Sequence, residues 1–201
     1  MRLTVYTALT VIGIFADATL AGEAPKAEET FAESVAHAID TYLEQRQSDF
    51  ESPKAVSLFL ISPVAYSDAE YAEARRAQVG AEPFWIGSRP HKVFREISLP
   101  ALQAREFTRS LHRDLTYPKE HDEYRLSSFC LFRPMHAFKI SFRDGQTLEG
   151  AICVHCRDLM FRLPRPGLEE YRGVQTQESS DELTELLPIP KALEDQFFPR
   201  Q

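Results

Sequence analysis

The segment that most constrains the fold has the pattern of a long β-hairpin. Its arms, residues 126–142 and 146–163, are rich in aromatic and β-branched residues, and residues 143–145 (Arg-Asp-Gly) lie between them. A three-residue loop with a glycine in the left-handed region is a common hairpin connection, and Gly145 is placed for that role. We therefore expect an antiparallel β-ribbon in the C-terminal half of the chain.

The register of this hairpin follows from the loop. The apolar residues carry even numbers on both arms, and paired residues share a face, so the numbers of two partners must sum to an even value. The predicted pairs are Phe142 with Gln146, Ile140 with Leu148, His136 with Ile152, Phe132 with Cys156, and Cys130 with Asp158. This register predicts that Cys130 and Cys156 are diagonal neighbours on the core face, whereas Cys153 points to the other face.

All three cysteines lie in the hairpin, and the first interpretation is a disulfide between Cys130 and Cys156. Paired cysteines are usually bonded in an oxidising, exported compartment. A diagonal Cβ separation of roughly 7 Å exceeds the roughly 4 Å that a disulfide needs. The bond therefore requires a bulge, which Pro134 favours, and it leaves Cys153 as the odd thiol.

Two other interpretations of these residues stay open. One is a zinc site with three cysteines and one histidine, whose ligands would be Cys130, Cys153, Cys156 and either His136 or His155. The other is a redox dithiol of Cys153 and Cys156, with His155 lowering the pKa of a thiol. Regular strand alternation disfavours the zinc site, because it puts Cys153 and Cys156 on opposite faces. Thioredoxin-type dithiols begin at a helix N-terminus after a strand, whereas strand-like residues flank this motif on both sides, which disfavours the redox interpretation. A core-facing, hydrogen-bonded His136 is the simpler structural role for that side chain.

The N-terminus predicts a secretory signal peptide over residues 1–21. A basic residue precedes an uncharged apolar run from Leu3 to Phe15, and small residues precede cleavage positions after either Ala18 or Ala21. The run is shorter than the about 20 apolar residues that a membrane span needs. We expect an exported protein, periplasmic or extracellular, with no membrane span once the signal is removed.

The rest of the sequence predicts a polar leader at 22–28 and one domain at 29–201. The chain is 43% hydrophobic with a net charge of -7, which suits a folded core and argues against nucleic-acid binding. Helices are predicted at 29–50, 67–80, 98–115 and 181–198 with a break at 188–190, strands at 55–61 and 92–98, and loops at 83–90, 117–124 and 167–180. The fold class is therefore α+β: a small, mainly antiparallel sheet with a long C-terminal hairpin, packed against two to four helices.

The hairpin resembles a family of uncharacterised exported bacterial proteins that share the motif C-x-x-P-x-H, a short Asp/Gly turn, and I-C-x-x-C. The matching positions here are Cys130, Pro134 (one residue later than that spacing), His136, Asp144, Gly145, Ile152, Cys153 and Cys156. Family members commonly have an aromatic residue where this chain has Val154. The resemblance implies no activity, but it implies that the three cysteines and His136 act as a set.

No familiar catalytic motif is present in the sequence: it has no Gly-rich phosphate loop, no G-x-S-x-G, no H-E-x-x-H and no EF-hand loop. We therefore expect a non-enzymatic binding or structural role for an exported domain. The alternative is a metal-binding or thiol-redox protein that uses Cys130, Cys153 and Cys156. Trp85, the only tryptophan, follows Phe84 and is a candidate for lining a binding groove.

Overall fold

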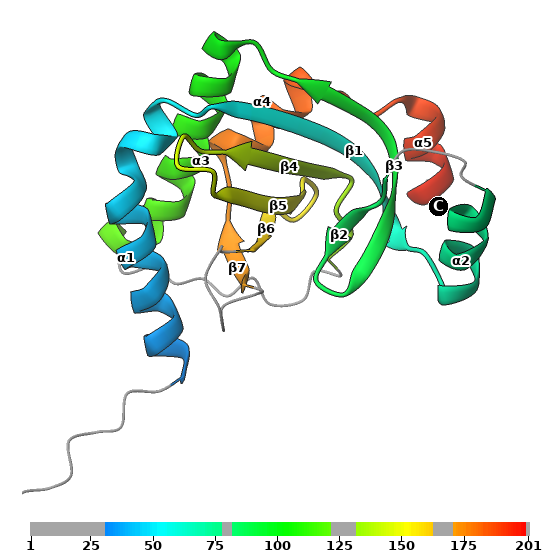
Figure 1. Cartoon of the computed structure of the whole chain (residues 1–201), viewed down its shortest axis with the longest axis horizontal. Helices are drawn as coiled ribbons and strands as arrows, with labels where there is room; N and C mark the ends of the chain where they lie inside the picture. Colours follow the sequence, from blue (N-terminus) through cyan, green and yellow to red (C-terminus); the bar gives the residue numbers. More distant parts are fainter. Residues whose placement is uncertain (1–30, 78–81, 122–131, 163–170, 200–201) are drawn as a thin grey trace, which may run out of the picture.

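The structure, a computed structural model, describes residues 31–77, 82–121, 132–162 and 171–199. These residues form an α+β fold around a seven-stranded antiparallel sheet with the order β2-β3-β1-β4-β5-β6-β7 (Figure 1). The elements are α1 (Phe31–Glu51), β1 (Ala55–Ala65), α2 (Asp68–Ala77), β2 (Phe84–Ile86), β3 (Arg89–Ser98), α3 (Ala101–His121), β4 (His136–Ser141), β5 (Thr147–Cys153), β6 (Asp158–Arg162), β7 (Tyr171–Gln175), α4 (Glu178–Leu186) and α5 (Lys191–Phe197). In the part of the chain that is described, no helix is long and apolar enough to span a bilayer.

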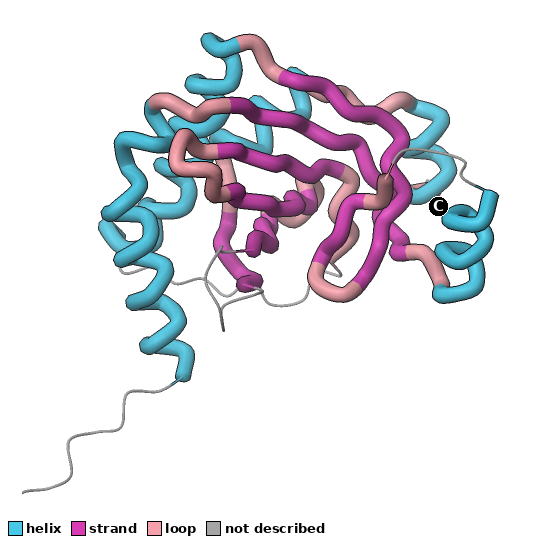
Figure 2. The backbone as a smooth tube through the Cα atoms, viewed as in Figure 1, coloured by secondary structure: helices cyan, strands magenta, loops and turns pink. Residues whose placement is uncertain are grey.

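One face of the sheet, called here the helix face, carries the main core beneath α1, α3 and α4 (Figure 2). Alternate residues of the central strands point to this face and meet the apolar stripes of the helices. The largest fully buried side chains include Phe50, Phe107, Phe138, Phe142, Leu58 and Leu60. The expected packing of a few helices on one side of an antiparallel sheet is thus confirmed.

The opposite face, called here the second face, carries a smaller apolar cluster of Ile61, Phe84, Ala137 and Ala151. Phe84 belongs to β2, at one end of the strand order, whereas Ala137 and Ala151 belong to the central strands β4 and β5. The sheet therefore curls until β2 lies over its own second face.

The β4–β5 hairpin has the register that the sequence predicted. Gly145 has φ of +85°, and the amide of Phe142 donates to the carbonyl of Gln146 at 2.9 Å. His136 pairs with Ile152, and Ile140 pairs with Leu148. The left-handed glycine is thus the feature that sets the pairing of these two strands.

The second arm of the hairpin is shorter than expected. Instead of one strand over 146–163, β5 ends at Cys153, residues 154–157 turn, and β6 begins at Asp158. Asp158 therefore pairs with Cys153, so the predicted pairs of Cys130 with Asp158 and of Phe132 with Cys156 are wrong. The turn places Arg157 at φ 56°, a conformation unusual for a residue other than glycine.

Other elements also differ from the sequence predictions. The first arm, expected over 126–142, is shorter in its described part, because β4 begins at His136 and residues 132–135 form no strand. Residues 84–86, expected in a loop, form the edge strand β2, and residues 171–175, expected in a polar loop, form the edge strand β7. Helix α3 continues to His121, past the predicted end near 115. Both unexpected strands are short and lie at a sheet edge, where pairing to one neighbour suffices and the alternating apolar pattern is weak.

Helix α2 forms with no buried residue of its own. A reciprocal capping box begins it: the Ser67 amide donates to Glu70 Oε2 at 2.8 Å, and the Glu70 amide donates to Ser67 Oγ at 3.3 Å. Acidic residues in its first turn and Arg75 and Arg76 in its last turn complement the helix dipole. Local interactions rather than core packing therefore define α2.

Gly150 is required by the ring that crosses it. A Cβ at this position would lie 2.4 Å from Cζ of Phe138, and Phe138 is the Cα partner of Gly150 on β4. We expect Gly150→Ala to lower the free energy of unfolding by about 1–3 kcal/mol through overpacking, although alanine otherwise suits a strand better than glycine. Urea denaturation measures this loss. In a Phe138→Leu background the same substitution is expected to cost less, and an equal cost in both backgrounds would contradict this explanation.

Candidate functional site

His136 lies wholly inside the helix face, where its ring holds the end of α4. Its Nε2 lies 2.7 Å from the carbonyl oxygen of Leu187, the residue that ends that helix. A carbonyl only accepts, so Nε2 carries the proton and donates, and Nδ1 is the unprotonated nitrogen. Nδ1 is buried with no hydrogen-bond partner among the described atoms. Burial is the main reason that the pKa of His136 is lowered below 6.5.

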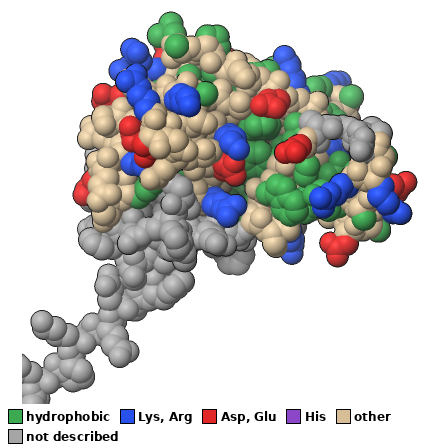
Figure 3. Space-filling view, viewed as in Figure 1, with side chains coloured by type: hydrophobic (Ala, Val, Ile, Leu, Met, Phe, Trp, Pro, Cys, Tyr) green, Lys and Arg blue, Asp and Glu red, His purple; other side chains and the backbone are tan. Residues whose placement is uncertain are grey.

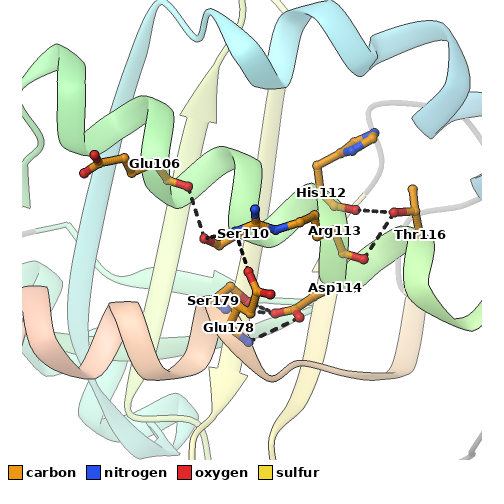
Figure 4. A network of polar contacts seen from close by, with 8 residues as sticks. All are labelled: Glu106, Ser110, His112, Arg113, Asp114, Thr116, Glu178 and Ser179. Carbon is orange, nitrogen blue, oxygen red and sulfur yellow. Dashed lines mark hydrogen bonds and ion pairs between the residues drawn. The ribbon is translucent and has the colours of Figure 1, made fainter.

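The other end of α4 is held by a buried carboxylate of α3. Asp114 accepts the amide of Ser179 at 2.9 Å, the hydroxyl of Ser179 at 2.6 Å and the amide of Glu178 at 3.3 Å (Figure 4). Arg113 adds an ion pair to Glu178 on the outside. A negative side chain at the first helical amides is stabilising, so Asp114 and His136 fix α4 at opposite ends. The sequence did not single out Asp114 because its partners lie far along the chain.

The cysteines and His136 are not gathered around one point within the described residues. Cys153 is 1% exposed and is a free thiol, and strand alternation places it on the face opposite to His136. Cys156 lies in the turn after β5 and is partly exposed. Cys130 lies outside the described residues, so its pairing with Cys156 stays a prediction. Within the residues searched, no three His, Cys, Asp or Glu side chains are placed to hold a metal ion.

Asp158 is a second buried carboxylate, which the sequence placed opposite Cys130 but did not indicate as a site residue. It begins β6 as the Cα partner of Cys153, is 2% exposed, and its Oδ1 has no hydrogen-bond partner among the described atoms. The thiol and the carboxylate thus lie together beneath the surface of the second face. Their burial makes this corner a part of the interior rather than an open reactive centre.

A groove opens where β2 lies over β5 and β6, and we call it the β2–β6 groove. Its apolar lining comes from Phe84 and Ile86 on one side and from Ala151 and Met160 on the other. The described walls leave a cavity of about 20 Å³, which is room for one water molecule. Pockets that enclose small-molecule ligands are typically larger, about 300–1,000 Å³. The groove therefore does not enclose a metabolite, and a docking segment would lie along its surface.

Charged side chains border the groove. Glu149 and Arg162 line it as Cα partners on β5 and β6, and Lys139 of β4 binds Glu149 with an Nζ–Oε1 distance of 2.8 Å. Figure 3 shows hydrophobic side chains gathered in a hollow, with acidic and basic side chains around it. Because Glu149 is already paired with Lys139, the described border has an excess of one positive charge at Arg162.

Aromatic side chains lie beside the groove, on the side of β2 that faces away from its lining. Trp85 is 44% exposed, and its ring meets Tyr71 of α2 edge to face at a centroid distance of 5.5 Å. Tyr66 lies 6.4 Å from Tyr71, and the neighbouring Val64 is 62% exposed. Large apolar groups exposed together at one place mark interaction surfaces more often than isolated ones do. Trp85 is thus a surface residue beside the groove rather than a core residue.

A second hollow lies between α1 and α3. It has a volume of about 280 Å³ and is lined by Gln47, Phe50, Glu51, Arg109, His112 and Arg113. Opposite charges offset each other in this lining, and Arg113 is already engaged by Glu178. His112 donates to a backbone carbonyl of α1 and packs on Phe50, so its role is to join the two helices.

Comparisons with known proteins found no match to the chain among family models, curated proteins or solved structures. The function of the groove must therefore be argued from its own geometry.

The buried histidines predict how stability depends on pH. Burial lowers the pKa of His136, His91 and His112 in the folded protein, so the unfolded chain binds more protons as the pH falls below about 6.5. The free energy of unfolding should therefore decrease from pH 7.5 to 5.5, by up to about 1.4 kcal/mol per pH unit for each histidine that stays neutral.

Urea denaturation at several pH values measures the dependence of the free energy of unfolding on pH. The substitution His136→Gln tests how much of this dependence one histidine contributes. Glutamine can still donate to Leu187 but does not titrate, so the variant should show a shallower acid slope whatever its stability at pH 7.5. An unchanged slope would mean that His136 binds protons equally in the folded protein and the unfolded chain, so that burial does not lower its pKa.

Proposed function

We propose that the chain is an exported, non-enzymatic binding domain that holds an apolar segment of a partner protein in the β2–β6 groove. The observation that carries the proposal is an apolar groove beneath an edge strand whose other side carries a half-exposed tryptophan. Tryptophan, tyrosine and arginine dominate the binding energy of protein interfaces; Arg162 lines the groove, and Trp85 with Tyr71 lies on the other side of β2. Export rests on the signal peptide expected at residues 1–21, which lies outside the described residues.

The lining of the groove supports binding rather than covalent chemistry. Its described residues include no hydroxyl, thiol or imidazole side chain. The one carboxylate, Glu149, is paired with Lys139 instead of facing a second acid. General acid–base and nucleophilic catalysis need such groups within hydrogen-bond reach of a substrate.

The cysteines have a supporting role in this proposal. A disulfide between Cys130 and Cys156 would tie the segment before β4 to the β5–β6 turn, and Cys153, which is free and buried, is left as the third thiol. A disulfide that closes a loop of this length stabilises a domain by about 3–4 kcal/mol. The bond would therefore strengthen the frame that positions β5 and β6 along the groove.

Thiol counting tests the disulfide. The exported protein, unfolded without reductant and treated with iodoacetamide, should take up one label, on Cys153, and reduction should raise the number to three because the chain has three cysteines. Peptide mapping by mass spectrometry locates the labels. Three labels without reductant, or stoichiometric zinc in the purified protein, would instead favour the metal or thiol alternative.

A charge placed in the groove tests the binding function. Peptides selected from a phage-displayed library of random linear heptamers on the wild-type protein should change the fluorescence of Trp85, the only tryptophan. Met160→Glu should weaken their binding at least about tenfold, because a carboxylate in the groove must lose its hydration when the segment docks.

Leu102→Glu is the matched control for this experiment. It places the same charge at a residue that is 66% exposed on α3, outside the groove lining, and should leave the binding unchanged. Equal binding by the two variants, or a library that yields no binder, would contradict the proposal.

A further inference from the structure

The outer edge of β2 offers backbone groups that are not used within the sheet. β2 is the first strand in the sheet order, so among the described strands β3 is its one neighbour. Trp85 is the Cα partner of Pro90, which has no N–H, and the Pro90 carbonyl accepts the amide of Tyr66 at 2.8 Å on the side away from β2.

The direction of the Trp85 backbone follows from these contacts. In an antiparallel pair, directly opposed residues either exchange two hydrogen bonds or exchange none, and Trp85 with Pro90 is a pair of the second kind. The N–H and C=O of Trp85 therefore point away from β3, toward the free edge. A backbone N–H and C=O without partners in the sheet form the template to which an added strand binds.

Both faces of this edge are apolar. Successive side chains of β2 alternate, so Phe84 and Ile86 point into the β2–β6 groove while Trp85 points to the other side and meets Tyr71. A strand paired with β2 would place one side chain against Trp85 and its two neighbours in the groove. The edge therefore favours a segment with consecutive apolar residues.

The charges around the edge indicate what flanks that segment. Arg89 is the Cα partner of Ile86 at the end of β2, and Arg162 lines the groove. Within the described residues neither arginine forms an ion pair with a carboxylate. Glu149, which also lines the groove, is paired with Lys139. Acidic residues beside the apolar ones would be complementary to both arginines.

We propose that β2 binds an extended, apolar segment of a partner protein, flanked by acidic residues, as an added strand that is hydrogen-bonded to the N–H and C=O of Trp85. This inference rests on the proposed function and names the mode of binding and the chemistry of the partner. The short β2 supplies one such pair of backbone groups, so side chains in the groove supply the remaining affinity.

Two substitutions at one residue test the strand pairing. Trp85→Ala and Trp85→Pro both remove the indole ring, but only proline removes the N–H, and proline is tolerated on an edge strand whose N–H faces solvent. Fluorescein-labelled heptamers, selected as above on the wild-type protein, report affinity by anisotropy. We expect Trp85→Pro to bind roughly tenfold more weakly than Trp85→Ala, because one backbone hydrogen bond is lost.

Modified peptides repeat the test without changing the protein. Methylation of the backbone nitrogen at alternate positions of a selected peptide should weaken binding to wild-type protein at the positions that face β2 and leave the others unchanged. Replacement of the acidic residues by lysine should also weaken binding. Unfolding midpoints of both Trp85 variants confirm that the fold is retained.

The outcomes separate the two proposals. Equal binding by both Trp85 variants and no effect of methylation would overturn strand addition, while the proposed function would stand if Met160→Glu still weakened binding. A library without binders would overturn both. A concentration-dependent dimer, detected by light scattering and abolished by Trp85→Pro, would identify the occupant as a second copy of the chain and overturn the proposed partner.

Discussion

The pairing of β4 with β5 is the constraint on which most of the structure depends. Gly145 turns the chain in the left-handed conformation, and one shift of that register would move every side chain of the ribbon to the opposite face. With the observed register, Phe138 lies over Gly150 on the helix face and Ala137 meets Ala151 on the second face. The core beneath the helices and the floor of the β2–β6 groove are therefore two consequences of one turn.

Much of this could be predicted from the sequence because the residues that define it act locally. Gly145 marks the loop, alternation sets the faces, and Ser67 with Glu70 marks the start of α2. The turn at 154–157 could not be predicted in this way, because its residues are Val, His, Cys and Arg and none is a usual turn residue. Arg157 has a left-handed backbone conformation, and only a glycine at this position would have indicated a turn in the sequence. The sequence therefore predicted one strand where the structure has β5 and β6, and it placed Cys156 in a strand instead of in the turn.

The polar residues show why a candidate site is harder to predict than a fold. His136 attracted attention as a ligand, yet its contact with Leu187 makes it a structural group at the end of α4. Asp114 holds the other end of α4. Nothing in the sequence indicates this role, because its partner Ser179 is distant in the chain. Trp85 became a surface residue only because β2 lies at an edge of the sheet. Each role depends on contacts between distant segments, which composition and spacing do not reveal.

The position of β1 has a consequence for how the chain reaches this fold. Strands β4 to β7 follow one another in space as they do in sequence, so neighbouring segments can form the meander with short connections. β1 lies between β3 and β4, and its pairing with β4 must close a chain segment that includes α2, β2, β3 and α3. Closing such a loop costs entropy before any contact repays it, and topologies of this kind fold slowly. The insertion of β1 is thus expected to be the rate-limiting event of folding.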